Sequence, residues 1–122
     1  MNPIVELTTG ILPTIFPDAN IFAYRLQDDY QKLTKLPIIK VENVNESNAG
    51  YGSNRYSSRN YQIQVMAFLD IQKQDIEQFN DQLDRGVEKH GFFLQYADDR
   101  PHEEFKHIQV ITRQYSHSKI KD

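Results

Sequence analysis

Residues 60–69 are Asn-Tyr-Gln-Ile-Gln-Val-Met-Ala-Phe-Leu, and this stretch decides the fold class. Every second residue in it is apolar, from Tyr61 to Leu69. Successive side chains of a strand point to opposite faces, so this alternation predicts a β-strand with one buried face. The positions between them become apolar at Met66 and Phe68. That change indicates a strand in the middle of a sheet, partly covered on both sides.

A helix is predicted to follow, over residues 70–89. Its apolar residues recur at helical spacing on one stripe, namely Ile76, Phe79, Leu83 and Val87. Asp70 is the predicted N-cap, and Gly91 is predicted to end the helix in the left-handed conformation. Gly86 lies inside the helix, where glycine costs about 1 kcal/mol relative to alanine. We therefore expect either a close neighbour at Gly86 or early fraying.

The residues on the N-terminal side predict one helix and two further strands. Apolar residues at helical spacing indicate a helix over 3–16, in which Pro3 suits the first turn and Pro13 is expected to cause a kink or an early end. Aromatic and β-branched residues predict strands over 21–26 and 37–44.

The residues after the second helix predict two more strands. They span 92–97 and 105–115, with a polar turn at 98–102 between them, and we expect 116–122 to form a loosely ordered tail. The chain of 122 residues, 39% of them hydrophobic, is the size of one domain. We therefore predict a single α+β domain over residues 1–122. Its mixed or antiparallel sheet of about five strands carries two helices, in the order α-β-β-β-α-β-β.

The stretch 45–58 is rich in asparagine, glycine and serine and predicts a long mobile loop between two strands. Tyr51, Arg55, Tyr56 and Arg59 interleave aromatic and basic side chains there. Three interpretations stay open: stacking on single-stranded nucleic acid, a protein interface, or a surface loop without a partner. We favour the protein interface, which makes these four residues a predicted partner-docking loop.

Composition excludes several classes of site and protein. The chain has no cysteine, which rules out disulfides, thiolate metal sites and a cysteine nucleophile. No apolar stretch approaches the ~20 residues of a membrane span, and we expect neither a signal peptide nor a membrane anchor. The net charge of −3, with the acidic excess after Met66, argues against binding duplex DNA through phosphates.

Carboxylates and imidazoles around 98–107 form the best candidate metal site. The residues are Asp98, Asp99, His102, Glu103, Glu104 and His107. These side chains could bind magnesium, manganese or zinc, but their spacing matches no ligand signature, so we predict a solvated turn and no metal. His90 and His117 lie elsewhere along the chain, and no nucleotide-binding or nucleophile-elbow motif is present. We predict no catalytic residue and no cofactor.

The order of elements, the polar loop and the run at 60–68 leading into an acidic helix resemble small tail components of long-tailed phages. The tail terminator family, whose members are also described as minor tail proteins, is the type most resembled. The resemblance extends from the first helix to the last strand. It consists of patterns of elements, without an invariant chemical motif.

This resemblance implies a non-enzymatic virion protein that forms a ring, commonly hexameric. The ring caps the tail tube and joins it to the head, so the implied partners are other copies of the chain, the tail tube protein and head–tail connector proteins. DNA is implied only as passing cargo. The implied location is the phage tail or neck, or the host cytoplasm during assembly. The alternatives are another connector or minor tail protein, a metal-dependent hydrolase or nuclease, and a nucleic-acid-binding regulator.

Overall fold

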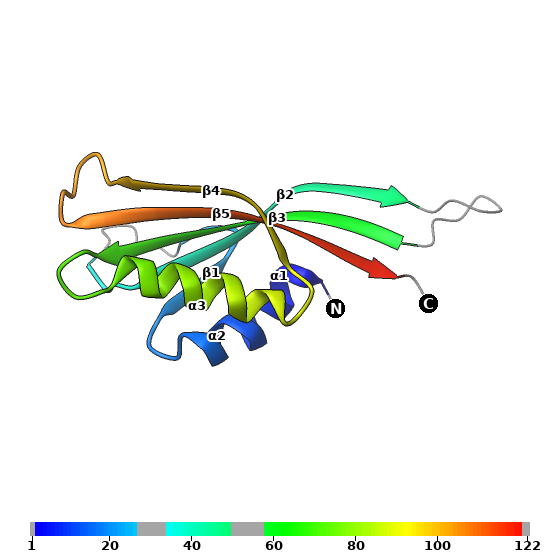
Figure 1. Cartoon of the computed structure of the whole chain (residues 1–122), viewed down its shortest axis with the longest axis horizontal. Helices are drawn as coiled ribbons and strands as arrows, with labels where there is room; N and C mark the ends of the chain where they lie inside the picture. Colours follow the sequence, from blue (N-terminus) through cyan, green and yellow to red (C-terminus); the bar gives the residue numbers. More distant parts are fainter. Residues whose placement is uncertain (1, 27–33, 50–57, 121–122) are drawn as a thin grey trace.

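The computed structural model describes residues 2–26, 34–49 and 58–120, which form one sheet with helices on a single face (Figure 1). Its five strands are β1 (Asn20–Ala23), β2 (Ile38–Ala49), β3 (Ser58–Asp70), β4 (Phe93–Pro101) and β5 (Ile108–Ile120). Their order across the sheet is β1-β2-β3-β5-β4, with β1 parallel to β2 and every other neighbouring pair antiparallel. The predicted α+β class and order of elements are confirmed, and the strand that decided the class, β3, is the central one.

The N-terminal helical segment consists of α1 (Pro3–Glu6), the π-helical η1 (Leu7–Ile11) and α2 (Leu12–Ile15). The Asn2 side chain caps it by accepting a hydrogen bond from the Ile4 N–H at 2.7 Å. Pro13 has no N–H to donate, and in a regular α-helix its ring clashes with the carbonyl four residues earlier. The wider π turn ends at Ile11, two residues before Pro13. The distortion expected there therefore takes the form of a π-helical turn.

The second helix, α3 (Ile76–Glu88), starts later than predicted. Its N-cap is Asp75, whose carboxylate accepts a hydrogen bond from the Gln78 N–H at 3.1 Å. Asp70, the predicted cap, instead ends β3 and accepts from the Gln72 N–H in the connecting turn. The prediction was wrong because each aspartate is followed by an isoleucine and then two polar residues, and only pairing of β3 with β5 as far as Asp70 distinguishes them.

Two glycines behave as the sequence predicted. Gly91 ends the turn after α3 with a φ of +86°, a left-handed conformation that glycine adopts without steric cost. At Gly86 an added Cβ would collide with the Ile15 side chain of α2. Gly86 therefore allows the two helices to pack closely, and of the two expectations the close neighbour is confirmed.

The core lies between the helices and one face of the sheet. Its buried residues include Leu7 and Leu12 from the N-terminal helix and the predicted stripe of α3 at Phe79, Leu83 and Val87. The sheet contributes Ile39, Val41, Ile63, Val65, Ala67, Leu69, Ile111 and Tyr115. The alternation predicted for 60–69 is thus confirmed from Ile63 to Leu69. In the described residues no helix has both the length and the apolar character needed to cross a membrane.

Three strands are longer than predicted. β2 continues to Ala49 and β3 begins at Ser58, so the predicted loop over 45–58 is wrong at both ends, and 50–57 lie outside the described residues. β5 continues to Ile120 by pairing with β3, so the predicted loose tail is strand over 116–120. The error has one physical reason: backbone pairing sustains a strand without apolar side chains.

The connection between β4 and β5 also differs from the prediction. Residues 98–101, predicted as a turn, belong to β4 and pair with β5, whereas Phe105, predicted to start the last strand, lies in the turn. The Ile108 N–H donates to the Phe105 carbonyl, and the His102 N–H donates to the Ile108 carbonyl. Alternation is weak in β4 because most of its side chains are exposed.

The distal parts of β2, β3 and β5 form what we call the arm, residues 45–49, 58–62 and 116–120. Continuous antiparallel pairing joins them, and the last pairs are Ala49 with Ser58 and Ser58 with Ile120. The arm runs past the ends of the helices (Figure 1). None of the side chains described in it is fully buried. Where the arm leaves the helices, Tyr61 packs against the core and His117 stacks on the buried Phe92.

Candidate functional site

A groove lies on the sheet face opposite the helices, near the β4–β5 turn. It has a volume of about 530 Å³. Met66 and Phe68 of β3, together with Val110 of β5, give it an apolar floor, and Tyr96 of β4 lines one side. We call it the open-face groove. Its apolar floor suits a hydrophobic side chain of a partner.

Acidic residues dominate the rim of the open-face groove. Asp98, Glu103 and Glu104 line it together with one guanidinium, that of Arg100. Arg100 Nε lies 2.6 Å from Asp98 Oδ2, so this ion pair neutralises one carboxylate. Glu103 and Glu104 are exposed. The rim is therefore negative and favours a partner that brings positive charge.

An amide ladder crosses the same sheet face beside the groove. Gln62 donates to Gln114 at 2.9 Å, Gln114 donates to Gln64 at 3.1 Å, and Gln64 donates to Glu42 at 3.0 Å. The chain of hydrogen bonds connects β2, β3 and β5. These side chains are half-buried and fix one another, so the surface beside the groove is rigid as well as polar.

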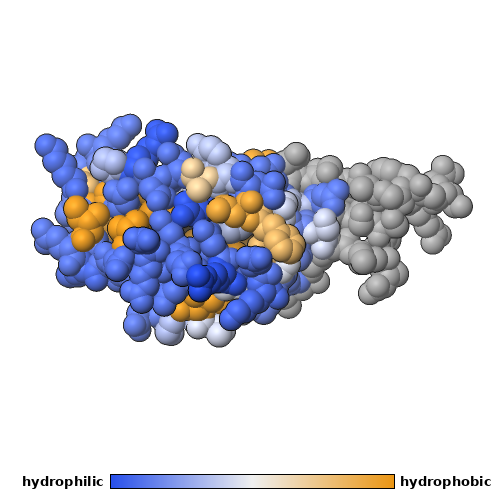
Figure 2. All heavy atoms as spheres, viewed as in Figure 1, coloured by the Kyte–Doolittle hydropathy of each residue, from blue (hydrophilic) through white to orange (hydrophobic). Residues whose placement is uncertain are grey.

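In the sheet that the described residues form, β4 is an edge strand, and it carries large apolar side chains. Phe93, Leu94 and Tyr96 are between 42% and 51% exposed. A β-bulge between Leu94 and Tyr96 interrupts the regular pairing with β5. The face of the molecule drawn in Figure 2 is largely hydrophilic, with small separate hydrophobic patches. Apolar residues on an edge strand are typical of surfaces that contact other chains.

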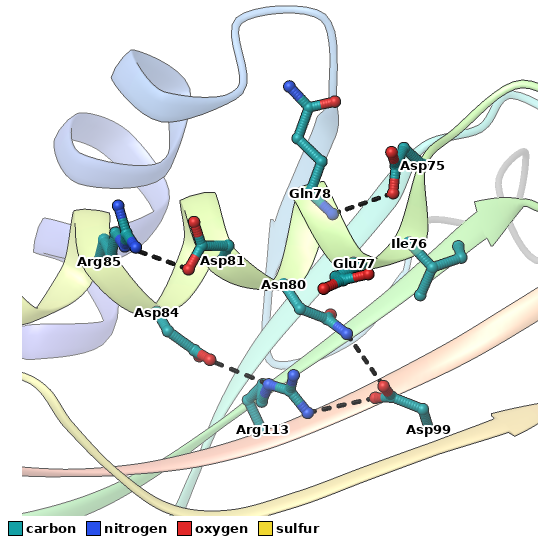
Figure 3. Close-up of a pocket in the computed structure, with 10 residues that line it drawn as sticks. All are labelled: Asp75, Ile76, Glu77, Gln78, Asn80, Asp81, Asp84, Arg85, Asp99 and Arg113. Carbon is teal, nitrogen blue, oxygen red and sulfur yellow. Dashed lines mark hydrogen bonds and ion pairs between the residues drawn. The ribbon is translucent and has the colours of Figure 1, made fainter.

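The other face of the sheet carries a polar cluster centred on Arg113 of β5 (Figure 3). Arg113 is only 7% exposed. Its Nη1 donates to Asp99 of β4 at 3.2 Å, and its Nε lies 3.4 Å from Asp84 Oδ1 of α3 without forming a hydrogen bond. Asn80 of α3 donates to the second oxygen of Asp99 at 2.9 Å. The cluster therefore ties α3 to two strands.

Tyr115 of β5 also belongs to this cluster and lies between the sheet and α3. Its hydroxyl donates to Asp84 at 2.6 Å. Burial raises the pKa of Tyr115 well above its ordinary value, and the hydrogen bond to Asp84 and the charge of Asp84 raise it further, while Arg113 opposes them. The hydroxyl therefore stays protonated and keeps donating at any physiological pH.

A shallow hollow of about 1070 Å³ lies beside the Arg113 cluster, along α3. Figure 3 shows its acidic side chains, with Asp84 and Asp99 turned toward Arg113 and Asp81 paired with Arg85. The two carboxylates lie 3.4 Å and 3.2 Å from nitrogens of Arg113 and offset its charge. Nothing in this arrangement brings a nucleophile to a base. The contacts of Arg113, Asp84 and Asp99 connect α3 to the sheet.

The structure does not bring the candidate metal ligands together. Asp98 contacts Arg100, while Asp99 contacts Arg113 and Asn80. The two aspartates also lie on opposite faces of the sheet. Asp98 lines the open-face groove, and Asp99 lines the hollow along α3. Within the described residues no group of three or more histidines and carboxylates could hold a metal ion.

The histidines with described contacts pack structurally. His102 Nδ1 accepts hydrogen bonds from the N–H groups of Glu104 and Phe105 and so holds the β4–β5 turn. His117 Nδ1 lies 2.9 Å from the Gly91 carbonyl oxygen, and its ring stacks on Phe92 with centroids 4.0 Å apart. His90 and His107 are exposed at the surface.

The predicted partner-docking loop is only partly covered by the structure. Tyr51, Arg55 and Tyr56 lie outside the described residues. Arg59 belongs to β3, where its backbone pairs with Asn48 and Lys119 in the arm. The segment that carries the other three residues therefore connects the ends of β2 and β3 at the tip of the arm.

No protein-family model and no curated protein matches the chain.

Sequence reasoning missed the Arg113 cluster and the open-face groove. Arg113 alternates with Ile111 and Tyr115, so the period of two could have placed it on the buried face of β5. Asp84 follows Leu83 of the apolar stripe, at the edge of the buried helix face. No sequence signal could have found the groove, because it combines residues from three strands and a turn.

Proposed function

We propose that the protein is a structural component of a phage virion that assembles with copies of itself and with other tail proteins. The role we propose is that of a tail terminator, in which a ring closes the tail tube and joins it to the head. The observation that carries the proposal is the arm. β2, β3 and β5 span 12, 13 and 13 residues, about twice the mean length of a strand.

The length of the arm supports a role in assembly because the three strands continue past the helices that cover the core (Figure 1). Ordering one residue costs about 1–2 kcal/mol of backbone entropy, and among the described arm side chains Tyr61 packs against the core but none is fully buried. Contacts with other chains would supply the stabilising free energy that offsets the entropy cost of ordering a projecting sheet. The free edge at Phe93, Leu94 and Tyr96 offers a second surface of this kind.

The groups needed for catalysis do not converge within the described part of the chain. Asp98 and Asp99, the strongest metal-ligand candidates, have separate ion-pair partners. The structure thus gives no specific support to a metal-dependent hydrolase or nuclease. A head–tail connector or another minor tail protein remains the alternative within the same class, because such proteins would use an arm and a free edge in the same way.

The proposal predicts a symmetric oligomer in solution. Size-exclusion chromatography with light scattering over a range of concentrations measures the mass directly. Incubation with purified tail tubes then tests whether the oligomer binds their ends. A mass that stays at 14.4 kDa at every concentration, without any binding to tubes, would contradict the proposal.

A further inference from the structure

The structure points to the occupant of the open-face groove: we propose that it receives the segment 50–57 of a neighbouring copy of the same chain. The inference rests on the proposed self-assembly and specifies which two surfaces meet.

The described residues (2–26, 34–49 and 58–120) leave the open-face groove uncovered. Both helices pack on the opposite sheet face. At one end of the groove, Leu36 and Phe105 pack with Phe68 over Ile38 and Ile108, and this small cluster closes that end. Beyond it Met66 and Val110 are only half-buried. Half-buried apolar side chains in a groove are free to gain further burial from a partner.

The segment 50–57 has the composition that this groove requires. It reads Gly-Tyr-Gly-Ser-Asn-Arg-Tyr-Ser, with two tyrosines, one arginine and no acid. A tyrosine ring can cover the floor formed by Met66 and Val110, and Arg55 can approach the exposed Glu103 and Glu104 on the rim. Tyrosine and arginine are also the residues that contribute most often to binding at protein interfaces.

The segment cannot reach the groove of its own chain. The ends of β2 and β3 that flank it lie at the end of the sheet opposite the β4–β5 turn (Figure 1). Along β3 the distance from Ser58 to Met66 is about 27 Å at the rise of a strand. Eight residues with both ends fixed side by side extend at most about 16 Å, even when fully extended. The occupant must therefore come from a second copy.

This contact is heterologous, because the arm tip of one copy meets the groove of the next. A heterologous contact repeats from copy to copy, and it closes into a ring when the rotation between copies allows. The arm then acts as the spacer that carries the segment beyond the helices of its own domain. The inference thus gives the proposed ring a specific subunit contact.

Two variants test the contact by complementation. The groove variant carries Glu103→Lys and Glu104→Lys, two exposed positions in the β4–β5 turn. The tip variant carries Tyr51→Ala, Arg55→Gln and Tyr56→Ala. Each is expected to weaken self-association at least tenfold, as measured by sedimentation equilibrium, because each copy loses one of the two surfaces. The matched control, Glu77→Lys with Glu88→Lys, makes the same charge change on exposed positions of α3 and should associate as the unchanged protein does.

A mixture of the two variants retains one intact contact, between the tip of the groove variant and the groove of the tip variant. We expect a 1:1 dimer and no larger oligomer, detected by native mass spectrometry. If both variants oligomerise normally, or if both fail and the mixture does not dimerise, the groove is not the docking site, although the ring itself can still exist. If the unchanged protein is monomeric, the proposed function fails together with this inference.

Discussion

Replacing Arg113 with leucine should cause a large loss of stability. The guanidinium is 7% exposed and lies between Asp84 and Asp99, whose side chains are 28% and 32% exposed. Removing it leaves two carboxylates with only Tyr115 and Asn80 as partners. Breaking a buried pair costs about 3–5 kcal/mol, and the partial exposure of the two carboxylates places this case at the lower end, about 3 kcal/mol.

The midpoint of thermal unfolding converts this energy into a simple measurement. For 122 residues the entropy of unfolding is about 0.26 kcal/mol per degree, so 3 kcal/mol corresponds to a decrease of about 12 °C. Calorimetry or circular dichroism measures the midpoint. Arg100→Leu is the matched control, because Arg100 pairs with Asp98 but is 71% exposed, and its loss should cost less than about 1 kcal/mol. Equal decreases of the midpoint for the two substitutions would refute the idea that burial makes the contribution of Arg113 to stability large.

Three further predictions follow from particular residues. Burial raises the folded-state pKa of Tyr115, so the stability it contributes is present below pH ~10 and declines as pH rises above that value; denaturant titrations at pH 9 and pH 11 should show a smaller decline for Tyr115→Phe than for the unchanged protein. Gly86→Val should lower the thermal midpoint because the valine side chain collides with Ile15. At Gly10 nothing lies within 4 Å of an added Cβ, so Gly10→Ala should leave the free energy of unfolding unchanged or increase it by up to about 1 kcal/mol. Equal midpoints for the two variants would exclude close helix packing at Gly86. Replacing 50–57 with a short glycine-rich turn should preserve the midpoint and abolish binding to tail tubes, and a shortened protein that still binds tubes would contradict a docking role.

The sequence predicted the elements whose pattern is local. The alternation of Ile63, Val65, Ala67 and Leu69 needs only neighbouring residues, and it placed β3 correctly at the centre of the sheet. The left-handed end at Gly91 followed from one residue type. The sequence could not choose between Asp70 and Asp75 as the helix cap, because their local contexts are similar and pairing between distant strands decides the outcome.

The arm and the polar sites depend on contacts between distant parts of the chain. Residues 45–49 have the composition of a loop, yet they are strand because β3 pairs with them and β5 pairs with β3 in turn. Asp98 and Asp99 are adjacent in the sequence and therefore suggested one site. In β4 adjacent side chains point to opposite faces, and each aspartate has its own arginine partner. A turn assignment for 98–102 concealed this separation.

Electron microscopy of the purified protein tests most directly whether this chain functions by assembling with itself. We predict closed rings of uniform diameter, with the copies related by rotation about a central axis. Monodisperse single domains without rings, at concentrations well above those reached during virion assembly, would contradict that central claim.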